Sequence, residues 1–215
     1  MIRITEAACR IVLHDPLLIS SAEREIMVMP RASEAWTADA VRALPDDGNR
    51  YELIDGELVV TPAPRYTHQR AVLRLLRLFD PWLGQTGAFE VLMSPADISL
   101  GEDEILQPDL FVYATADAQP IHEWRDITRL ILVIEVLSPT TARYDRQLKR
   151  RRYQRAGVPE YWIVDLDGRV VERWRPNDQR PEVLTDRLEW TPNPAQIAQL
   201  EIDLPSFFTG VLGNA

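Results

Sequence analysis

A single lysine, Lys149, stands among twenty-three arginines in this chain of 215 residues. Solvated positive charge tolerates either residue, but guanidinium is planar and bulky and practically never loses its proton, so it cannot replace a compact, movable ammonium. We therefore regard Lys149 as a candidate for a chemical role. The alternative is an exposed lysine paired with Asp145, four residues upstream, an arrangement worth about 0.3–0.5 kcal/mol on a helix. The sequence alone leaves both interpretations open.

Two acidic residues are candidates for the same site. Glu135 interrupts the apolar run 130–137, and burying a carboxylate is costly unless it is paired or bound to a cation. The alternative is a strand face that reaches solvent. Asp109, at the start of a short apolar strand, is by itself an ordinary residue for that position. If both converge, they are suited to a hard divalent cation such as Mg2+, and an added ammonium would make the set a hydrolytic site for phosphoryl groups.

The elements that must position these residues follow from local patterns. Thr37 is a suitable N-cap for a short helix that ends before Pro45, and Asp55-Gly56 between two apolar runs predicts a β-hairpin. An apolar stripe predicts a helix over about 67–83 with His68 on its buried side. We further expect strands at 89–94, 96–100, 107–113, 130–137 and 161–165, a helix over about 142–156 closed by Gly157, a second hairpin through Asp167-Gly168 to 169–174, and weaker strands before a short terminal helix.

This order of elements predicts an α/β (α+β mixed) fold. A hairpin-rich first half followed by strand, helix and strand gives a sheet of mixed direction, without the regular alternation of a barrel or a doubly wound fold. The nearly continuous hydrophobicity of 130–137 predicts a central strand that is covered on both faces. Residues 1–33 lack clear periodicity and are interpreted as an N-terminal extension with poor order, and residues 34–215 as one domain.

The composition is that of a globular protein, with 46% hydrophobic and 27% charged residues. The single cysteine, Cys9, excludes an internal disulfide, so a reducing cytoplasm is the expected compartment. No apolar run approaches the roughly 20 residues that a bilayer span needs, and we expect no membrane association. With three histidines and one cysteine we expect no zinc site. Neither a Gly-rich phosphate loop nor a Gly-x-Ser-x-Gly motif occurs, and we expect no organic cofactor.

The net charge of −9 argues against a general nucleic-acid coat protein, but the distribution of charge can override the total. Seven basic residues fall within 143–155, and Arg70, Arg74 and Arg77 recur at helical spacing. These groups are either local phosphate-binding surfaces or solvated helix faces.

Several separated motifs occur in order along the chain. They are Tyr51-Glu-Leu-Ile-Asp-Gly-Glu57, His68, Pro108-Asp109, Glu135-Val-Leu-Ser-Pro-Thr-Thr, Asp145-x-x-x-Lys149-x-x-x-Tyr153 and Gly157-Val-Pro-Glu-Tyr-Trp-Ile-Val-Asp165. Over about residues 35–210 the chain resembles the Uma2 family of restriction-endonuclease-like proteins, within the PD-(D/E)XK nuclease superfamily. The resemblance implies a restriction-endonuclease-like core, a mixed β-sheet flanked by helices, preceded here by N-terminal β-hairpin elements.

The resemblance also implies roles for individual residues. Asp109 and Glu135 would be the Mg2+ ligands, with Mn2+ as a substitute. The usual lysine would fall at position 137, where this chain has Leu137, and in this family it is moved to the next helix, which matches Lys149. Glu52 would support the metal or a second water, and His68 would line the site.

The resulting prediction is a Mg2+-dependent endonuclease-like phosphodiesterase acting on DNA, in which Lys149 positions or activates the attacking water. We expect Arg146, Arg150, Arg70 and Arg74 to contact phosphates. A homodimer is expected from the wider superfamily, because duplex cleavage needs two active sites. Two alternatives remain: a non-cleaving DNA-binding or regulatory module on the same fold, and a metal-dependent hydrolase of RNA or small phosphodiesters. Asp97 is a weaker candidate for the metal shell, and we expect Tyr153 to pack against the sheet and orient the lysine.

Overall fold

The computed structural model describes residues 27–29, 36–101, 104–115, 121–139, 141–193, 195 and 197–213. Most of the predicted extension over 1–33 therefore lies outside the described residues. The exception is β1 (Met27–Met29), which pairs antiparallel with β3 (Glu57–Thr61). The division into an extension and a domain over 34–215 stays a prediction.

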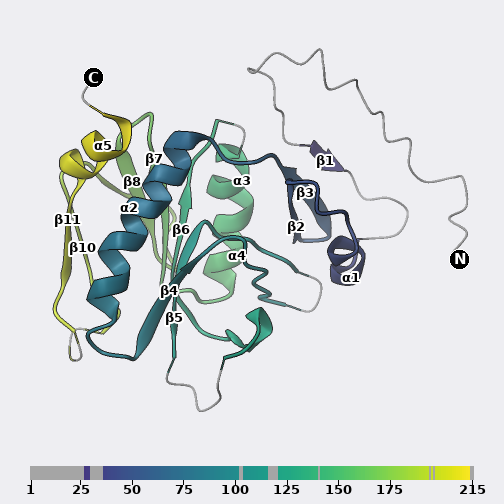
Figure 1. Ribbon diagram of the computed structural model, residues 1–215, viewed down its shortest axis with the longest axis horizontal. Helices are drawn as coiled ribbons and strands as arrows, with labels where there is room; N and C mark the ends of the chain where they lie inside the picture. The colour runs from purple at the N-terminus through teal and green to yellow at the C-terminus, as the bar shows by residue number, and fades with distance from the viewer. Residues whose placement is uncertain are drawn as a thin grey trace, which may run out of the picture.

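The first elements form a small unit beside the main sheet (Figure 1). Helix α1 (Ala38–Arg42) begins after Thr37, whose hydroxyl accepts a hydrogen bond from the backbone N of Ala40 at 3.2 Å. Strand β2 (Arg50–Ile54) pairs with β3 through a two-residue turn in which Asp55 has φ 52° and Gly56 has φ 80°. Positive φ at both central residues is what a tight hairpin requires. The predicted N-cap and the predicted hairpin are both confirmed.

The main sheet has six strands in the order β4-β5-β6-β7-β8-β9. Their bounds are β4 (Phe89–Met93), β5 (Leu110–Ala114), β6 (Leu130–Val136), β7 (Glu160–Asp165), β8 (Val170–Trp174) and β9 (Glu182–Leu184). Only β6 and β7 pair in parallel, and all other neighbours are antiparallel. The predicted sheet of mixed direction, flanked by helices, is confirmed.

Strand β6 lies inside the sheet, and every one of its residues is buried. Because side chains alternate along a strand, Leu132, Ile134 and Val136 belong to one apolar cluster, whereas Val133 belongs to another on the opposite face. Glu135 shares the face of Val133. The prediction of a central strand covered on both faces is confirmed, and Glu135 does not reach solvent.

One face of the sheet is covered by α2 (Tyr66–Leu83), by α5 (Leu204–Leu212) and by the two-stranded sheet of β10 (Arg187–Trp190) and β11 (Leu200–Asp203) (Figure 1). Phe79, Trp162 and Trp190 form the aromatic centre of this layer, with ring centroids 5.5–5.9 Å apart. The predicted helix over 67–83 and the short terminal helix are confirmed. None of the helices in the described ranges is long and apolar enough to cross a bilayer.

The connection between β6 and β7 is helical and covers the other face. It consists of α3 (Ala142–Tyr144), the π-helical turn η2 (Asp145–Lys149) and α4 (Arg150–Arg155), followed by Gly157 with φ 73°. The predicted helix and its left-handed glycine are present. The pattern did not indicate the wider turn within this helix, at the segment that carries Lys149. Such π-turns are rare and are frequently found at functional sites.

Two further predictions require correction. Residues 96–100 form no regular strand, since only an isolated bridge joins Ile98 to Leu106. Strand β5 begins at Leu110, so Asp109 precedes it. The described part also contains a short 3-10 helix, η1 (Trp124–Asp126), that the sequence pattern did not indicate.

We predict that Trp162→Ala lowers the unfolding free energy by about 3–5 kcal/mol, because it empties the aromatic centre of the core. Trp162 is 0% exposed, whereas Trp124 is 40% exposed. The matched variant Trp124→Ala should therefore cost about 1 kcal/mol or less. Urea unfolding followed by far-UV circular dichroism measures both, and similar costs would contradict the assignment of the core.

Candidate active site

A cavity of about 270 Å³ opens between the hairpin β2–β3, the start of α2 and the carboxyl end of β6. All five residues predicted to be catalytic line its wall, although they come from five separate segments of the chain. Glu52 lies on β2, His68 in the first turn of α2, Asp109 just before β5, Glu135 on β6 and Lys149 in η2.

Lys149 is the centre of this arrangement. Its Nζ lies 3.0 Å from Oε1 of Glu52, 3.0 Å from Oε1 of Glu135 and 3.7 Å from Oδ1 of Asp145. The residue is only 4% exposed. Burial by itself would lower the pKa of Lys149, but the surrounding carboxylates, Glu135 foremost, raise it above its ordinary value. The alternative of an exposed lysine paired only with Asp145 is therefore wrong, and the ammonium is charged.

Asp109 is held by three donors. Its Oδ1 accepts from Arg50 at 2.7 Å, and its Oδ2 accepts from the backbone N of Val136 and lies 2.9 Å from Nε2 of His68. Burial opposes the charge, but Arg50 and then His68 lower the pKa of Asp109 well below its ordinary value. Because an ionised carboxylate only accepts hydrogen bonds, Nε2 of His68 is the donor.

Glu135 is joined to both parts of the site. Its Oε1 accepts from Lys149, and its Oε2 accepts from the backbone N of Asp109 at 3.4 Å. Burial raises the pKa of Glu135 well above its ordinary value, despite the opposing effect of Lys149. Glu52 is anchored in addition by the backbone N of Gln107, which donates to its Oε1 at 2.8 Å.

The charges around the cavity are unbalanced. Four carboxyl groups, those of Glu52, Asp109, Glu135 and Asp145, face two permanent cations, Arg50 and Lys149. If all four were ionised, these six groups would carry two excess negative charges, one of which Arg65, exposed on the same cavity wall, would offset. Burial raises the pKa of Glu135 and Asp145, that of Asp145 to about 6. In the absence of a cation, burial therefore favours the protonated, uncharged forms of Glu135 and Asp145. A bound divalent cation would supply the balancing positive charge instead.

The aromatic residues behind η2 fix the position of Asp145. The hydroxyl of Tyr161 donates to the backbone O of Asp145 at 3.0 Å, and the ring of Tyr153 packs 5.0 Å from that of Tyr161. Tyr153 is completely buried against the sheet, as the sequence predicted. Within the described residues no hydrogen-bond partner reaches its hydroxyl.

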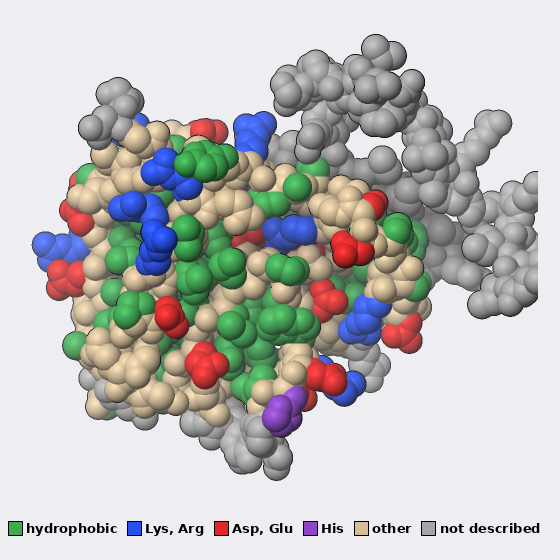
Figure 2. Space-filling view, viewed as in Figure 1, with side chains coloured by type: hydrophobic (Ala, Val, Ile, Leu, Met, Phe, Trp, Pro, Cys, Tyr) green, Lys and Arg blue, Asp and Glu red, His purple; other side chains and the backbone are tan. Residues whose placement is uncertain are grey.

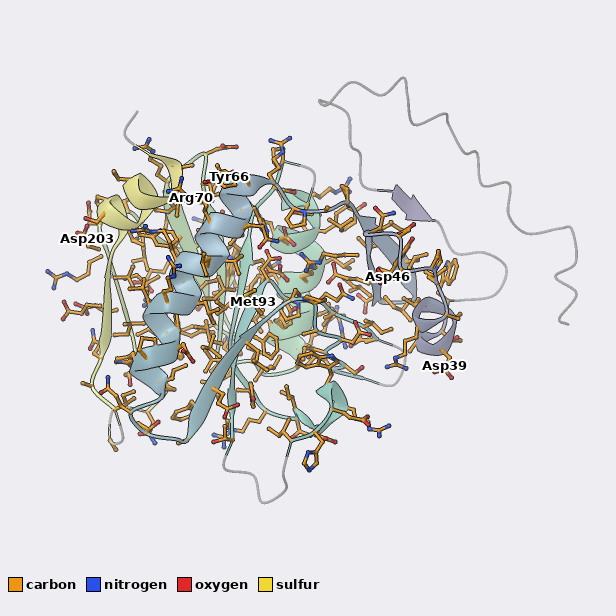
Figure 3. The ribbon with its side chains drawn as sticks, viewed as in Figure 1. Asp39, Asp46, Tyr66, Arg70, Met93 and Asp203 are labelled. Carbon is orange, nitrogen blue, oxygen red and sulfur yellow. The ribbon has the colours of Figure 1, made fainter. Side chains whose placement is uncertain are left out.

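The four arginines predicted to contact phosphates do not line the cavity. Arg146 is paired with Glu172 at 2.7 Å and Asp165 at 2.8 Å, and Arg150 lies over the ring of Trp174 at 4.5 Å. Arg70 donates to the backbone O of Gly210 at 2.6 Å and lies over Tyr66, near the start of α2 (Figure 3). Arg74 lies against Gly210, where a Cβ would collide with its guanidinium.

The basic side chains on α2 gather at the surface on one side of the molecule, and acidic side chains are scattered over the rest of that face (Figure 2). Phosphate binding by these arginines stays a prediction. Because they lie outside the cavity, they would contact phosphates of the nucleic acid away from the site of reaction.

The cavity wall also contains two arginines that the sequence analysis missed, Arg50 and Arg65. A signal for Arg50 was present in the sequence, because it lies two residues before Glu52, next to the apolar run predicted to form the hairpin, and such a spacing puts two residues on the same face of a strand. Asp97 lies away from the cavity. It accepts a hydrogen bond from the side chain of Gln107 at 2.8 Å and lines a separate hollow with Tyr113 and Trp124.

The profile of the family described as "Uma2: Putative restriction endonuclease" matches residues 38–205. The chain belongs to the Uma2 family. Among solved structures, this Uma2 protein is similar to "a putative nuclease belonging to DUF820 from Anabaena variabilis", with a TM-score of 0.69 and 19% identity. That match covers 82% of this chain and 99% of the other. At this identity it supports the fold. No curated protein matches the chain.

Membership in Uma2 confirms the predicted family and, at the level of the family, the predicted enzyme class of phosphodiester hydrolases. Restriction-endonuclease-like nucleases typically use divalent metals.

We predict that Asp145→Asn changes the dependence of stability on pH. The pKa of Asp145 is raised from 3.8 to about 6, so between these values the folded protein holds a proton that the unfolded chain has lost. The stability contributed by this group is full below about pH 4 and is lost as pH rises through about 6.

The unfolding free energy of D145N relative to wild type should therefore rise between pH 4 and pH 7, by on the order of 2 kcal/mol. Urea titrations at several pH values measure it, with D167N, which removes an exposed carboxyl group, as the control. A difference that stays constant for D145N would contradict this account.

Proposed function

We propose that this Uma2 protein is a divalent-metal-dependent endonuclease that hydrolyses phosphodiester bonds in DNA, with Mg2+ as the metal and Mn2+ as a substitute. The observation that supports it most is the convergence of Asp109, Glu135 and Lys149 on one cavity. The backbone N of Asp109 donates to Glu135, and Lys149 lies 3.0 Å from the same glutamate. Two acids and one ammonium from three segments are the side chains that such hydrolysis requires.

The chemistry of the donor set fits a hard divalent cation. Mg2+ is usually bound by one or two carboxylates together with waters and substrate phosphates, so a cage of three protein ligands is not needed. Among the described residues no group of three or more acidic, histidine or cysteine side chains is already arranged around a cation position. Asp109 and Glu135 would hold the ion, and the excess negative charge of the cavity would favour it.

A bound divalent cation polarises a phosphoryl group and lowers the pKa of water. The chain's own residues would orient the reacting groups. Because the pKa of Lys149 is raised, this residue would donate hydrogen bonds and offset developing negative charge, and would not abstract a proton. Glu52 would fix the ammonium, since it shares Lys149 with Glu135. His68 would orient Asp109 through Nε2.

The substrate and the assembly are further parts of the proposal. Arg65 is exposed on the wall of the cavity and would bind a DNA phosphate, as would Arg70, Arg74, Arg146 and Arg150 outside it. The affinity of phosphates for cationic side chains does not depend on base sequence. Each chain contributes one such cavity in its described part, so cleavage of both strands of a duplex would be served by a homodimer.

A second candidate function, binding without cleavage, is favoured by one observation. Both carboxylates proposed to hold the metal are already paired with protein cations, Asp109 with Arg50 and Glu135 with Lys149. A cavity that stays in this state would bind nucleic acid without cutting it. Retention of DNA on a filter with Mg2+ present, scored together with cleavage, separates the two functions. Competition among DNA, RNA and a nitrophenyl phosphodiester then identifies the substrate class.

We predict that wild type converts supercoiled plasmid to nicked or linear forms with Mg2+ or Mn2+. Lys149→Arg should lower the rate at least about tenfold, which corresponds to about 1.4 kcal/mol of barrier, because guanidinium keeps the charge but not the geometry of the ammonium. Gel electrophoresis over time measures the rates. Equal cutting by both proteins would remove Lys149 from the mechanism, and retention without cutting by wild type would favour the binding function.

We predict that Asp109→Asn and Glu135→Gln each weaken Mn2+ binding at least about tenfold, because each removes one charged ligand. Asp97→Asn serves as a matched control, since Asp97 bonds to Gln107 and lies outside the cavity. Isothermal titration with Mn2+ measures the affinities, after circular dichroism has shown that each variant is folded. A loss in D97N as large as in D109N would place the ion elsewhere.

A further inference from the structure

Arg50 lines the cavity with part of its guanidinium unpaired among the described residues. Its NH1 donates to Oδ1 of Asp109 at 2.7 Å, and its NH2 donates to the backbone O of Gln107. Its side chain is only 18% exposed, and Nε is buried without a partner among the described residues. A guanidinium is costly to bury unless its donors are satisfied, so this arrangement leaves part of its hydrogen-bonding capacity unused.

The contacts of Asp109 show what Arg50 occupies. A carboxylate offers about two acceptor positions on each oxygen. Both positions on Oδ2 are taken, one by the backbone N of Val136 and one by His68. On Oδ1, the described residues supply a single donor, Arg50. Oδ1 is therefore the atom of Asp109 that remains open to a further ligand, and a positive charge lies 2.7 Å from it.

A divalent cation bound to Oδ1 would lie close to the guanidinium of Arg50, and the two positive charges would repel each other. We propose that Arg50 is the resident counter-cation of Asp109, and that it releases Oδ1 when a divalent cation binds and then binds the phosphate of the substrate. This inference rests on the proposed function, because it requires the metal at Asp109.

The position of Arg50 suits such an exchange. Arg50 is the first residue of β2, two residues before Glu52, so one strand presents a cation to Asp109 and an anion to Lys149. Arg50 lines the same cavity as Asp109, Glu135 and Arg65, and its planar fork matches a phosphate with two parallel hydrogen bonds. The charge stays balanced, since a phosphate replaces Asp109 as the partner of the guanidinium.

The exchange makes metal and substrate binding interdependent. Without a phosphate, a cation must displace Arg50 from Asp109, its only charged hydrogen-bond acceptor among the described residues. With a phosphate in place, Arg50 has a new partner and the displacement costs less. Mn2+ and DNA should therefore each increase the affinity of the other, by the same factor.

The experiment compares full-length wild type, R50Q and R65Q by Mn2+ titration, with Mn2+ followed by electron paramagnetic resonance. R65Q is the matched control, because it removes the same charge from the same cavity wall and Arg65 is not a donor to Asp109. Without nucleic acid, R50Q should bind Mn2+ at least about fivefold tighter than wild type, and R65Q within about twofold of it. A short duplex with non-hydrolysable phosphate linkages, added at saturating concentration, should tighten Mn2+ binding in wild type but much less in R50Q.

Each outcome decides the inference. If D109N weakens Mn2+ binding while R50Q equals or falls below wild type, the inference is overturned and the proposed metal site stands. If no protein in the series, wild type included, binds Mn2+, the metal of the proposed function fails and the inference fails with it. If R50Q does not fold, R50K replaces it: its ammonium lacks the planar fork that fits Asp109 and the backbone O of Gln107 together, so it should hold Oδ1 less firmly and Mn2+ affinity should rise at least about twofold, and an unchanged affinity overturns the inference.

Discussion

The burial of Lys149 among Glu52, Glu135 and Asp145 is the interaction on which the rest of the site depends. Its ammonium lies 3.0 Å from two acids that belong to different sheets, one in the hairpin and one in the main sheet. Breaking a buried ion pair by removing one partner costs about 3–5 kcal/mol, because the other charge is left without compensation. The hairpin, β6 and η2 are therefore held together by charge at the cavity, in addition to apolar packing.

The acids of the cavity fall into two groups that differ in the direction of their pKa shift. Arg50 and His68 keep Asp109 ionised, whereas burial raises the pKa of Glu135 and Asp145. Strongly shifted pKa values among neighbouring carboxyl groups cluster at functional sites, where acids and bases need pKa values matched to their task. They also mean that a cation would displace protons from this cluster on binding, so its affinity would increase with pH.

Much of the fold could be predicted because its signals are local. Asp55-Gly56, Thr37 and Gly157 specify a turn, a cap and a helix end through backbone geometry, and Glu135 in an apolar strand indicated a buried acid. The π-turn at 145–149 and the absence of a regular strand at 96–100 depend on tertiary packing. The periodicity of hydrophobic residues along the sequence contains no information about such packing. The pairing of Arg50 with Asp109 joins residues 59 positions apart, and local patterns could not show that Arg70 and Arg74 would be held against Gly210.

Lys149 and Arg50, the two cations that pair with the acids of the cavity, are suited to their places by their shapes. Three carboxyl groups approach Lys149 from different elements, and an ammonium with three rotatable donors can meet acceptors that do not share a plane. Arg50 has two acceptors, Asp109 and the backbone O of Gln107, that come from one short segment, and a planar fork can bond to both. An arginine at position 149 would have to meet three separate acids with donors confined to one plane. The geometry thus gives a physical reason for lysine at this position in a chain that otherwise uses arginine.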